Sequence, residues 1–160
     1  MNVPILYESR MNNPYLFHAL SAGPTIVRRI IAQIPSEKYD SHTDPERFTM
    51  REAIAHIADW EAIDLQRIKQ AVENPGSDIQ PYDEVQVAKE HNYTASDLGE
   101  QLSLYEHRRR ETIAYLKSLT PEQWASKATH LEKGDLTVYD QANLVVGHDA
   151  YHIEHLSGFL

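Results

Sequence analysis

The apolar residues of the chain recur at helical spacing over four long stretches. Steps of three and four residues give each stretch one continuous apolar face, which is the pattern of an amphipathic α-helix. The predicted helices span residues 14–34, 49–73, 95–119 and 137–158. Pro35 marks the end of the first helix, and Thr49 and Thr94 are candidate N-caps of the second and third. A Gly23-Pro24 pair is expected to loosen or bend the first helix, because proline removes an internal hydrogen bond.

The connections between these helices are polar. They comprise residues 35–48, 74–94 and 120–136, in which 83–90 is predicted to form a short extra helix and 121–124 a turn. No repeat, low-complexity tract or interdomain linker is visible in the sequence. We therefore interpret residues 1–160 as one all-α domain, a four-helix bundle.

The composition excludes several classes of protein. The 160 residues include 15 Lys+Arg, 24 Asp+Glu, nine His and no Cys, with a net charge of −9. The lack of Cys excludes disulfides, thiolate zinc sites, iron–sulfur clusters and a cysteine nucleophile, and the acidic balance disfavours nucleic acid as a partner. No stretch approaches the roughly 20 apolar residues of a membrane span, and the start, MNVPILYESR, lacks the features of a secretory signal. We expect a soluble, cytoplasmic protein with a small-molecule substrate.

Histidine is the residue that carries candidate chemistry. In the last helix His148 and His152 are four residues apart, a spacing that lets one helix present two imidazoles to a metal ion. His155 falls in the same sector of that helix. A random sequence with nine His in 160 residues contains on average about 0.4 pairs at this spacing. The pair by itself is thus also consistent with hydrogen-bonded imidazoles at the edge of a core.

A third imidazole strengthens the interpretation as a metal site. If the second and last helices are antiparallel, His56, His148 and His152 all lie roughly 9–15 Å from the same end of the bundle. That arrangement requires the second and third helices to be parallel and therefore joined by a long crossover. The 74–94 connection can span roughly 70 Å when extended, which is long enough. The sequence thus predicts a bundle with this crossover and a three-His site.

Three neutral imidazoles without a thiolate suit Zn²⁺, Ni²⁺, Cu²⁺ or Fe²⁺, and they leave at least one coordination position open for catalysis. Water or a thiol bound at that position would ionise near neutral pH. Four carboxylates are candidate general bases or acceptors for the imidazole N–H groups. They are Asp59, Glu52, Asp149 and Glu154.

Two residues of the third helix are further candidates. Tyr105 falls at a depth similar to that of the His set and is a candidate catalytic residue lining a cavity, with a core tyrosine as the alternative. Arg109 occupies a position where the pattern requires an apolar residue. It can pair with a buried carboxylate, bind an anionic ligand or cofactor, or extend to solvent. The remaining histidines are interpreted as surface or loop residues: His18, His42, His91, His107 and His130.

Three segments carry a resemblance to a known family. They are REAIAHIADWE in the second helix, LTPEQW at 119–124 and GHDAYHIEHL at 147–156. In order and spacing they resemble the DinB/YfiT-like superfamily of metal-dependent enzymes over essentially the whole chain. The resemblance implies an up–down–down–up four-helix bundle, homodimers, and a divalent-metal site that maps onto His56, His148 and His152. Members with assigned activity include thiol-dependent S-transferases and a mycothiol-dependent isomerase.

The chain departs from this family just after the last His of the triad. Members often carry Gln three residues after that His, preceded by a basic residue and Gly, whereas this chain has Ile153-Glu154-His155. His155 is therefore a candidate fourth ligand, an outer hydrogen-bond donor or a neutral replacement, and we include it among the candidate catalytic residues with Asp59. The missing basic residue argues against docking of an anionic thiol cofactor as in the transferases.

Three functions are consistent with these observations. The first is a metal-dependent enzyme, with thiol transfer preferred over hydrolysis of an amide or ester. The second is a non-catalytic metal-binding or stress-response bundle that acts by ligand binding or dimerisation, and the third is an ordinary bundle with structural histidines. Since the chain has no Cys, thiol chemistry would require a low-molecular-weight thiol as cofactor.

Overall fold

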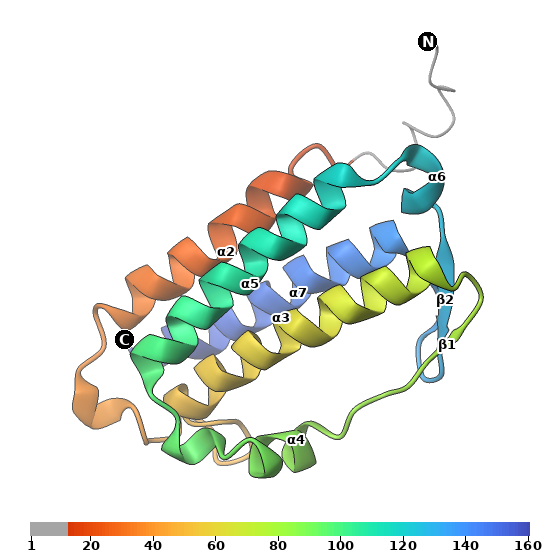
Figure 1. Cartoon of the computed structure of the whole chain (residues 1–160). Coiled ribbons are helices and arrows are strands. Elements are labelled where there is room, and N and C mark those ends of the chain that lie inside the picture. Colours follow the sequence, from red (N-terminus) through yellow and green to blue (C-terminus); the bar gives the residue numbers. More distant parts are fainter. Residues whose placement is uncertain (1–12) are drawn as a thin grey trace.

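The computed structural model describes residues 13–160, and four long helices form a bundle within them (Figure 1). These helices are α2 (Leu16–Ile31), α3 (Met50–Glu73), α5 (Leu98–Ser118) and α7 (Val138–Ser157). The connections contain η1 (Ser36–Lys38), β1 (Asp78–Ile79), α4 (Glu84–Glu90), η2 (Tyr93–Ala95), α6 (Pro121–Trp124), β2 (Lys127–His130) and β3 (Gly134–Thr137). The segment that we interpreted as lacking a secretory signal lies outside the described residues. Within those residues, every helix is too short or too polar to cross a membrane.

The four helices have the up–down–down–up arrangement. Arg51 at the start of α3 donates to the carbonyl of Ser96, just before α5, and from there the two helices run parallel. His56 in the first half of α3 lies against His148 in the second half of α7, so α3 and α7 are antiparallel. The long connection through β1, α4 and η2 returns the chain to the beginning of α3 along the outside of the bundle (Figure 1). The predicted crossover is therefore confirmed.

Side-chain caps determine where the helices begin. Thr49 and Thr137 form capping boxes at the starts of α3 and α7. The predicted start of α5 at Thr94 is wrong, because Asp97 is the N-cap and accepts a hydrogen bond from the Glu100 N–H. α2 is also shorter than predicted, since it ends at Ile31 and a turn follows before Pro35.

A three-stranded sheet lies at one end of the bundle, and the hydrophobic pattern did not predict it. β2 and β3 form an antiparallel hairpin, and β1 of the crossover pairs in parallel with β2. The strands are two to four residues long, which is too short for a period-two alternation to stand out. The sheet buries His130, which is only 3% exposed. The interpretation of His130 as a surface or loop residue is therefore wrong.

Two large apolar clusters lie toward the two ends of the bundle, and a smaller third cluster joins α3 to the crossover through Ala55, Trp60, Val87 and Tyr93. One large cluster contains Val27, Ile30, Ile54, Ile57, Leu102 and Leu156, and the other contains Leu16, Leu20, Ile68, Leu116, Val138 and Val145. On α3, α5 and α7 a buried charged residue lies between the two sets of apolar residues: Glu61, Arg109 and Asp149. A polar layer therefore divides the core.

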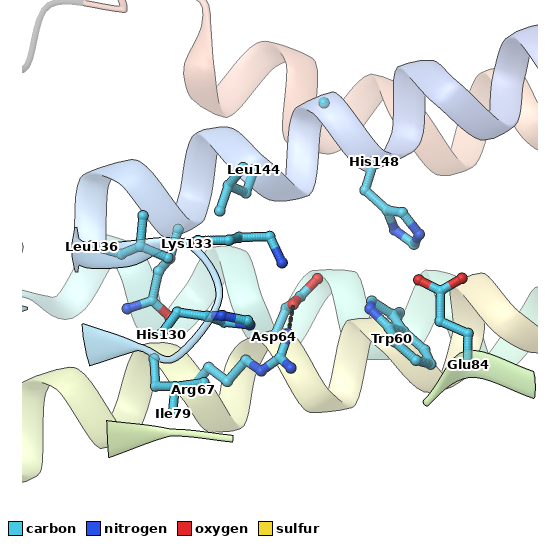
Figure 2. Close-up of a pocket in the computed structure, with 12 residues that line it drawn as sticks. Trp60, Asp64, Arg67, Ile79, Glu84, His130, Lys133, Leu136, Leu144 and His148 are labelled. Carbon is cyan, nitrogen blue, oxygen red and sulfur yellow. Dashed lines mark ion pairs between the residues drawn. The ribbon is translucent and has the colours of Figure 1, made fainter. Parts of the chain in front are cut away.

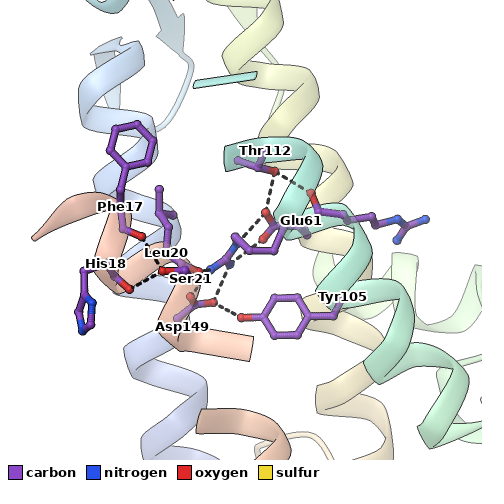
Figure 3. Close-up of polar contacts among 10 residues, drawn as sticks. Phe17, His18, Leu20, Ser21, Glu61, Tyr105, Thr112 and Asp149 are labelled. Atoms are coloured by element: carbon purple, nitrogen blue, oxygen red, sulfur yellow. Dashed lines mark hydrogen bonds and ion pairs between the residues drawn. The ribbon is translucent and has the colours of Figure 1, made fainter. Parts of the chain in front are cut away.

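The guanidinium of Arg109 is the centre of this polar layer, and Figure 3 shows its partners Leu20, Glu61 and Asp149. It donates to both carboxylate oxygens of Glu61 and of Asp149 over 2.6–2.9 Å, and to the carbonyl of Leu20 over 2.8 Å. These bonds occupy all five N–H donors of the side chain. Arg109 is 2% exposed and joins α2, α3, α5 and α7 at one level.

Two hydroxyl groups complete the layer. Tyr105 donates to Asp149 over 2.6 Å, and Thr112 donates to Glu61 over 2.7 Å (Figure 3). Both hydroxyls belong to α5, the helix that carries Arg109. A buried network is stable only when each polar group has a partner, and here two carboxylates, one guanidinium and two hydroxyls satisfy one another.

The Gly23-Pro24 pair lies inside α2, which continues through it to Ile31. Pro24 has no N–H for the carbonyl of Leu20 four residues earlier, and Arg109 donates to that carbonyl instead. Gly23 allows α7 to approach closely, because a Cβ there would lie 2.2 Å from Oδ2 of Asp149 and 3.2 Å from Nη1 of Arg109.

We predict that Gly23→Ala lowers the free energy of unfolding by about 1–3 kcal/mol, because the added methyl group displaces Asp149 from Arg109. At a helix position without such a close contact, Gly→Ala raises the free energy of unfolding by up to about 1 kcal/mol. Gly147→Ala is the matched control, since a Cβ there meets nothing within 4 Å. Urea unfolding followed by circular dichroism measures both variants. A Gly23→Ala protein as stable as Gly147→Ala would contradict the close approach.

Candidate metal centre

Three imidazoles converge where α3 and α7 meet. His56 of α3 and His152 of α7 each place Nε2 close to Nε2 of His148, at 3.0 and 3.1 Å. Among the described residues these three side chains form a cluster whose donor atoms all lie within 4.8 Å of one another. The predicted metal-ligating residues are therefore brought together in space.

The polar layer around Arg109 fixes the positions of these imidazoles along the bundle. Glu61, which holds α3 to Arg109, is five residues after His56. Asp149, which holds α7 to Arg109, directly follows His148. A slip of either helix by one turn would leave a buried carboxylate unpaired, which is costly. The ion network therefore fixes the register in which the imidazoles of α3 and α7 face each other.

Burial keeps the imidazoles neutral. It lowers the pKa of His56 to about 3, with a further decrease from His148. It also lowers the pKa of His148 to about 4, although the neighbouring Asp149 acts in the opposite direction. Burial and then the other two imidazoles lower the pKa of His152 still further. All three rings are therefore unprotonated at pH 7 and have a lone pair available for a metal ion.

The donor set fits a divalent cation. A neutral imidazole has one N–H and one lone pair, so Nε2 of His148 cannot form good hydrogen bonds with the Nε2 atoms of both neighbours at once. Two nitrogens bound to one tetrahedral Zn²⁺ at 2.0–2.1 Å lie about 3.3 Å apart, close to the 3.0 and 3.1 Å found here. One cation that accepts all three lone pairs resolves the conflict.

Aromatic rings hold His56 in place. The ring of Trp60, one turn further along α3, lies 4.4 Å from that of His56 between centroids, and the ring of Phe48 lies 5.2 Å away. The ring of Tyr151 packs edge-on against His152 at 5.0 Å. These contacts limit the rotation of the imidazoles and restrict access of water from those sides.

Two cavities meet at the triad. The larger has a volume of about 560 Å³ and is lined by all three imidazoles together with Phe48, Arg47, Glu52, Tyr151 and His155. The smaller, of about 290 Å³, lies between α3, α7 and the β2–β3 hairpin (Figure 2). His148 and Glu84 line both cavities. A molecule in either cavity can therefore approach the same imidazole.

Asp59 is not brought to the triad. Its carboxylate accepts hydrogen bonds from the Tyr93 hydroxyl and the Arg108 guanidinium and contacts Nδ1 of His91. These partners lie on the connection and on α5, away from α7. The contact pairs His91, an exposed histidine of the connection, with Asp59.

Tyr105 and Arg109 belong to the core layer and line neither cavity. Burial raises the pKa of Tyr105 well above its usual value, so its hydroxyl stays protonated and donates to Asp149. Every donor of Arg109 is occupied by protein acceptors. The geometry therefore disagrees with the prediction that Arg109 binds a cofactor and supports the alternative of a buried ion pair.

His155 lies beside the site. It is 2% exposed and lines the larger cavity, and its ring centroid is 6.2 Å from that of His152. Its Nε2 is buried without a hydrogen-bond partner. Its nitrogens are not among the three that converge, so in this arrangement it borders the triad rather than completing it.

The other candidate carboxylates have structural partners. Glu52 accepts from the backbone N–H of Thr49 in the capping box of α3, and Glu154 pairs with Arg47. The Nδ1 atoms of His56 and His152 are buried without any partner. The expected carboxylate acceptors for these imidazoles are therefore not in place.

Several residues of the site were missed in the sequence. Besides Glu84, the smaller cavity is lined by Asp64, Arg67, His130, Lys133 and Gln141. A signal for two of them was present, because His56, Trp60, Asp64 and Arg67 follow one another at steps of four, four and three residues and so share one face of α3. The others come from connections and from the start of α7, which helical periodicity does not place.

Known proteins share this sequence pattern and fold. Residues 19–156 match the DinB superfamily. A "Putative metal-dependent hydrolase" of Oceanobacillus iheyensis is 24% identical over 134 residues, which cover 84% of this chain and 77% of the relative. The protein YfiT of Bacillus subtilis, which has the same description, is 22% identical over 139 residues, covering 86% of this chain and 78% of YfiT.

Two solved structures are also similar. That of YfiT, described as a probable metal-dependent hydrolase with an unusual four-helix bundle topology, has a TM-score of 0.84 at 22% identity and covers 91% of this chain and 84% of its own. A mycothiol-dependent maleylpyruvate isomerase has a TM-score of 0.72 at 14% identity and covers 89% and 60%. At these identities the structural likeness establishes the fold. Because the family match extends over residues 19–156, the chain belongs to the DinB superfamily.

Proposed function

We propose that this protein is a divalent-metal-dependent enzyme that transfers a small thiol to an electrophilic substrate. The observation that carries the proposal is the convergence of three neutral Nε2 atoms from His56, His148 and His152. A divalent ion held by these atoms would lower the pKa of a bound thiol or water toward neutrality and keep a position open for it. The named functions of the curated relatives also support metal dependence.

The two cavities favour a reaction between two molecules. Both reach His148, and their volumes of about 560 and 290 Å³ give each reactant a place of its own. In the transfer the thiol loses its proton, its sulfur forms a bond to an electrophilic carbon, and the leaving group departs with the electron pair of the broken bond. The chain contains no Cys, so the sulfur belongs to the co-substrate. The fold is shared with a mycothiol-dependent isomerase, which agrees with a thiol as one reactant.

Glu84 is the residue of this chain best placed to accept the proton. It lines both cavities, and burial raises the pKa of its carboxyl, with Lys133 acting in the opposite direction. A carboxyl with a raised pKa is a stronger base than an ordinary glutamate. Glu84 can therefore take up the proton of the nucleophile beside the imidazole that the two cavities share.

Hydrolysis is the second candidate. The same three imidazoles and the same carboxylate can serve an attacking water, and the two curated relatives are both named as metal-dependent hydrolases. The difference between the two candidates is the nucleophile. A comparison of thiol-dependent and thiol-independent turnover separates them.

We predict that the protein, purified without a histidine tag, binds one divalent ion per chain, and that His56→Ala and His152→Ala each reduce the metal content to near zero. Each substitution removes one of three donors. His107→Ala is the control, because His107 is exposed on α5. Elemental analysis after dialysis against Zn²⁺, Ni²⁺ or Fe²⁺ measures the content. Equal metal content in all four proteins would rule out the site.

We also predict turnover that needs both metal and thiol. The assay combines small thiols with 1-chloro-2,4-dinitrobenzene, in which thiol sulfur displaces chloride, and runs a parallel arm with p-nitrophenyl acetate and water alone. Chelation of the metal is expected to abolish the reaction, and His56→Ala to reduce it at least about a hundredfold. Turnover only in the ester arm would favour hydrolysis. Turnover unaffected by chelator in both arms would contradict metal dependence.

Glu84→Gln is expected to lower kcat about 10²-fold or more with metal content unchanged, because the variant loses the proton acceptor but no metal ligand. The decline of wild-type activity at acidic pH, which reports protonation of Glu84, should disappear in the variant. Glu90→Gln on the same short helix is the matched control, since Glu90 lines neither cavity. A pH profile of Glu84→Gln identical to that of the wild type would show that another group accepts the proton.

A further inference from the structure

The smaller cavity is lined by both apolar and charged side chains, whereas a packing defect in a core is lined by apolar side chains alone. Its apolar walls are Trp60, Ile79, Leu136 and Leu144, and its polar lining comes from α3, the β2–β3 hairpin and the start of α7. Figure 2 shows Lys133 and His130 extending from the hairpin side toward Asp64 and Arg67 of α3. At about 290 Å³ the cavity is at the lower end of the range of small-molecule sites. Its size and mixed lining suit a small amphipathic molecule.

Three residues that line this cavity each carry a buried side-chain nitrogen without a hydrogen-bond partner. They are Nε of Arg67, Nε2 of His130 and Nε2 of Gln141. His130 and Gln141 are 3% and 6% exposed. Buried polar groups nearly always have a partner, so three unpaired groups around one cavity indicate a ligand that supplies their partners.

All three nitrogens are donors. Those of Arg67 and Gln141 carry hydrogen in every state. Nδ1 of His130 accepts the backbone N–H of Glu132 over 3.2 Å, so the neutral ring carries its proton on Nε2. Burial and the nearby Lys133 and Arg67 lower the pKa of His130, which keeps the ring neutral. The missing partner is therefore a group with several acceptor oxygens.

The charges around the cavity favour a single negative charge on that group. Arg67 uses Nη2 for the carbonyl of Gln80 and has Nη1 3.6 Å from Asp64, which leaves Nε for a ligand. Lys133 adds a second cation (Figure 2). Asp64 and Glu84 oppose them, but burial raises the pKa of both carboxyls, that of Asp64 to about 7. Two cations and two weakened acids accommodate a carboxylate better than a doubly charged phosphate.

We propose that the cavity between α3, α7 and the β2–β3 hairpin binds the carboxylate of a small organic acid, held by Arg67, His130, Lys133 and Gln141. The apolar part of the acid lies along Trp60 and Leu144 and points toward His148, which the two cavities share. Carboxylate binding itself needs no metal. The identification of this acid as the substrate rests on the proposed function, whereas the binding site does not.

The test uses 3-phenylpropionate and its neutral amide, 3-phenylpropionamide, with the metal-free full-length protein. Titrations followed by NMR report the dissociation constants, and the side-chain amide signals of Gln141 report where the probe binds. The acid is expected to bind at least about tenfold more tightly than the amide and to shift the Gln141 signals, because charged hydrogen bonds exceed neutral ones in strength.

Two substitutions examine the polar lining separately. Lys133→Met and Gln141→Leu are each expected to weaken binding of the acid about five- to tenfold. Lys133→Met is also expected to leave binding of the amide nearly unchanged. Lys133 is exposed, so its replacement leaves the fold intact even where the buried Gln141→Leu does not. Lys127→Met is the matched control, since Lys127 lies in the same sheet but does not line the cavity.

Equal affinity for acid and amide, or acid binding by Lys133→Met equal to that of the wild type, would overturn the proposal. The same titrations with Zn²⁺-loaded protein distinguish a failure of the carboxylate site from a failure of the proposed function. Tight acid binding in a protein that retains no metal supports the carboxylate site and contradicts the metal-dependent reaction. Metal-dependent turnover in a protein that does not distinguish the acid from the amide contradicts the carboxylate site alone.

Discussion

The buried guanidinium of Arg109 is the interaction on which the arrangement of the bundle depends. Two carboxylates, two hydroxyls and a backbone carbonyl from four helices surround it, and removal of the cation would leave Glu61 and Asp149 buried as unpaired charges. The network determines the register of the helices, because five donors with fixed directions do not tolerate a shift of one turn. The leucine and isoleucine contacts of the flanking clusters tolerate such a shift.

This constraint has a direct consequence for the metal centre. Glu61 and Asp149 hold α3 and α7 in the one register that places His56 opposite His148 and His152. The ligands thus stand on rigid helices, while the connections contribute part of the walls of both cavities: Glu84 comes from α4, and His130 and Lys133 come from the hairpin. Such a division suits a family with varied substrates, since the connections can change without moving the imidazoles.

The sequence determined the parts that depend on helical periodicity and chain length. Four amphipathic stretches, the levels of three imidazoles and the length of the crossover were enough to predict the topology and the triad. Strands of two to four residues carry too little pattern to be recognised, and with them His130 and the smaller cavity were missed. Arg109 was identified as unusual and Asp59 as a candidate base. The partners of Arg109 lie 40 or more residues away in sequence and those of Asp59 lie 32 to 49 residues away, and side-chain direction decides such pairings.

The central claim is that the three imidazoles bind one metal ion through Nε2. X-ray absorption at the zinc edge of the Zn²⁺-loaded protein tests it most directly, because the spectrum reports the number and type of ligands and their distances. We expect three imidazole nitrogens at about 2.0–2.1 Å and one further light atom. A spectrum with only oxygen ligands, or with a single imidazole, would place the zinc elsewhere on the chain and contradict the account.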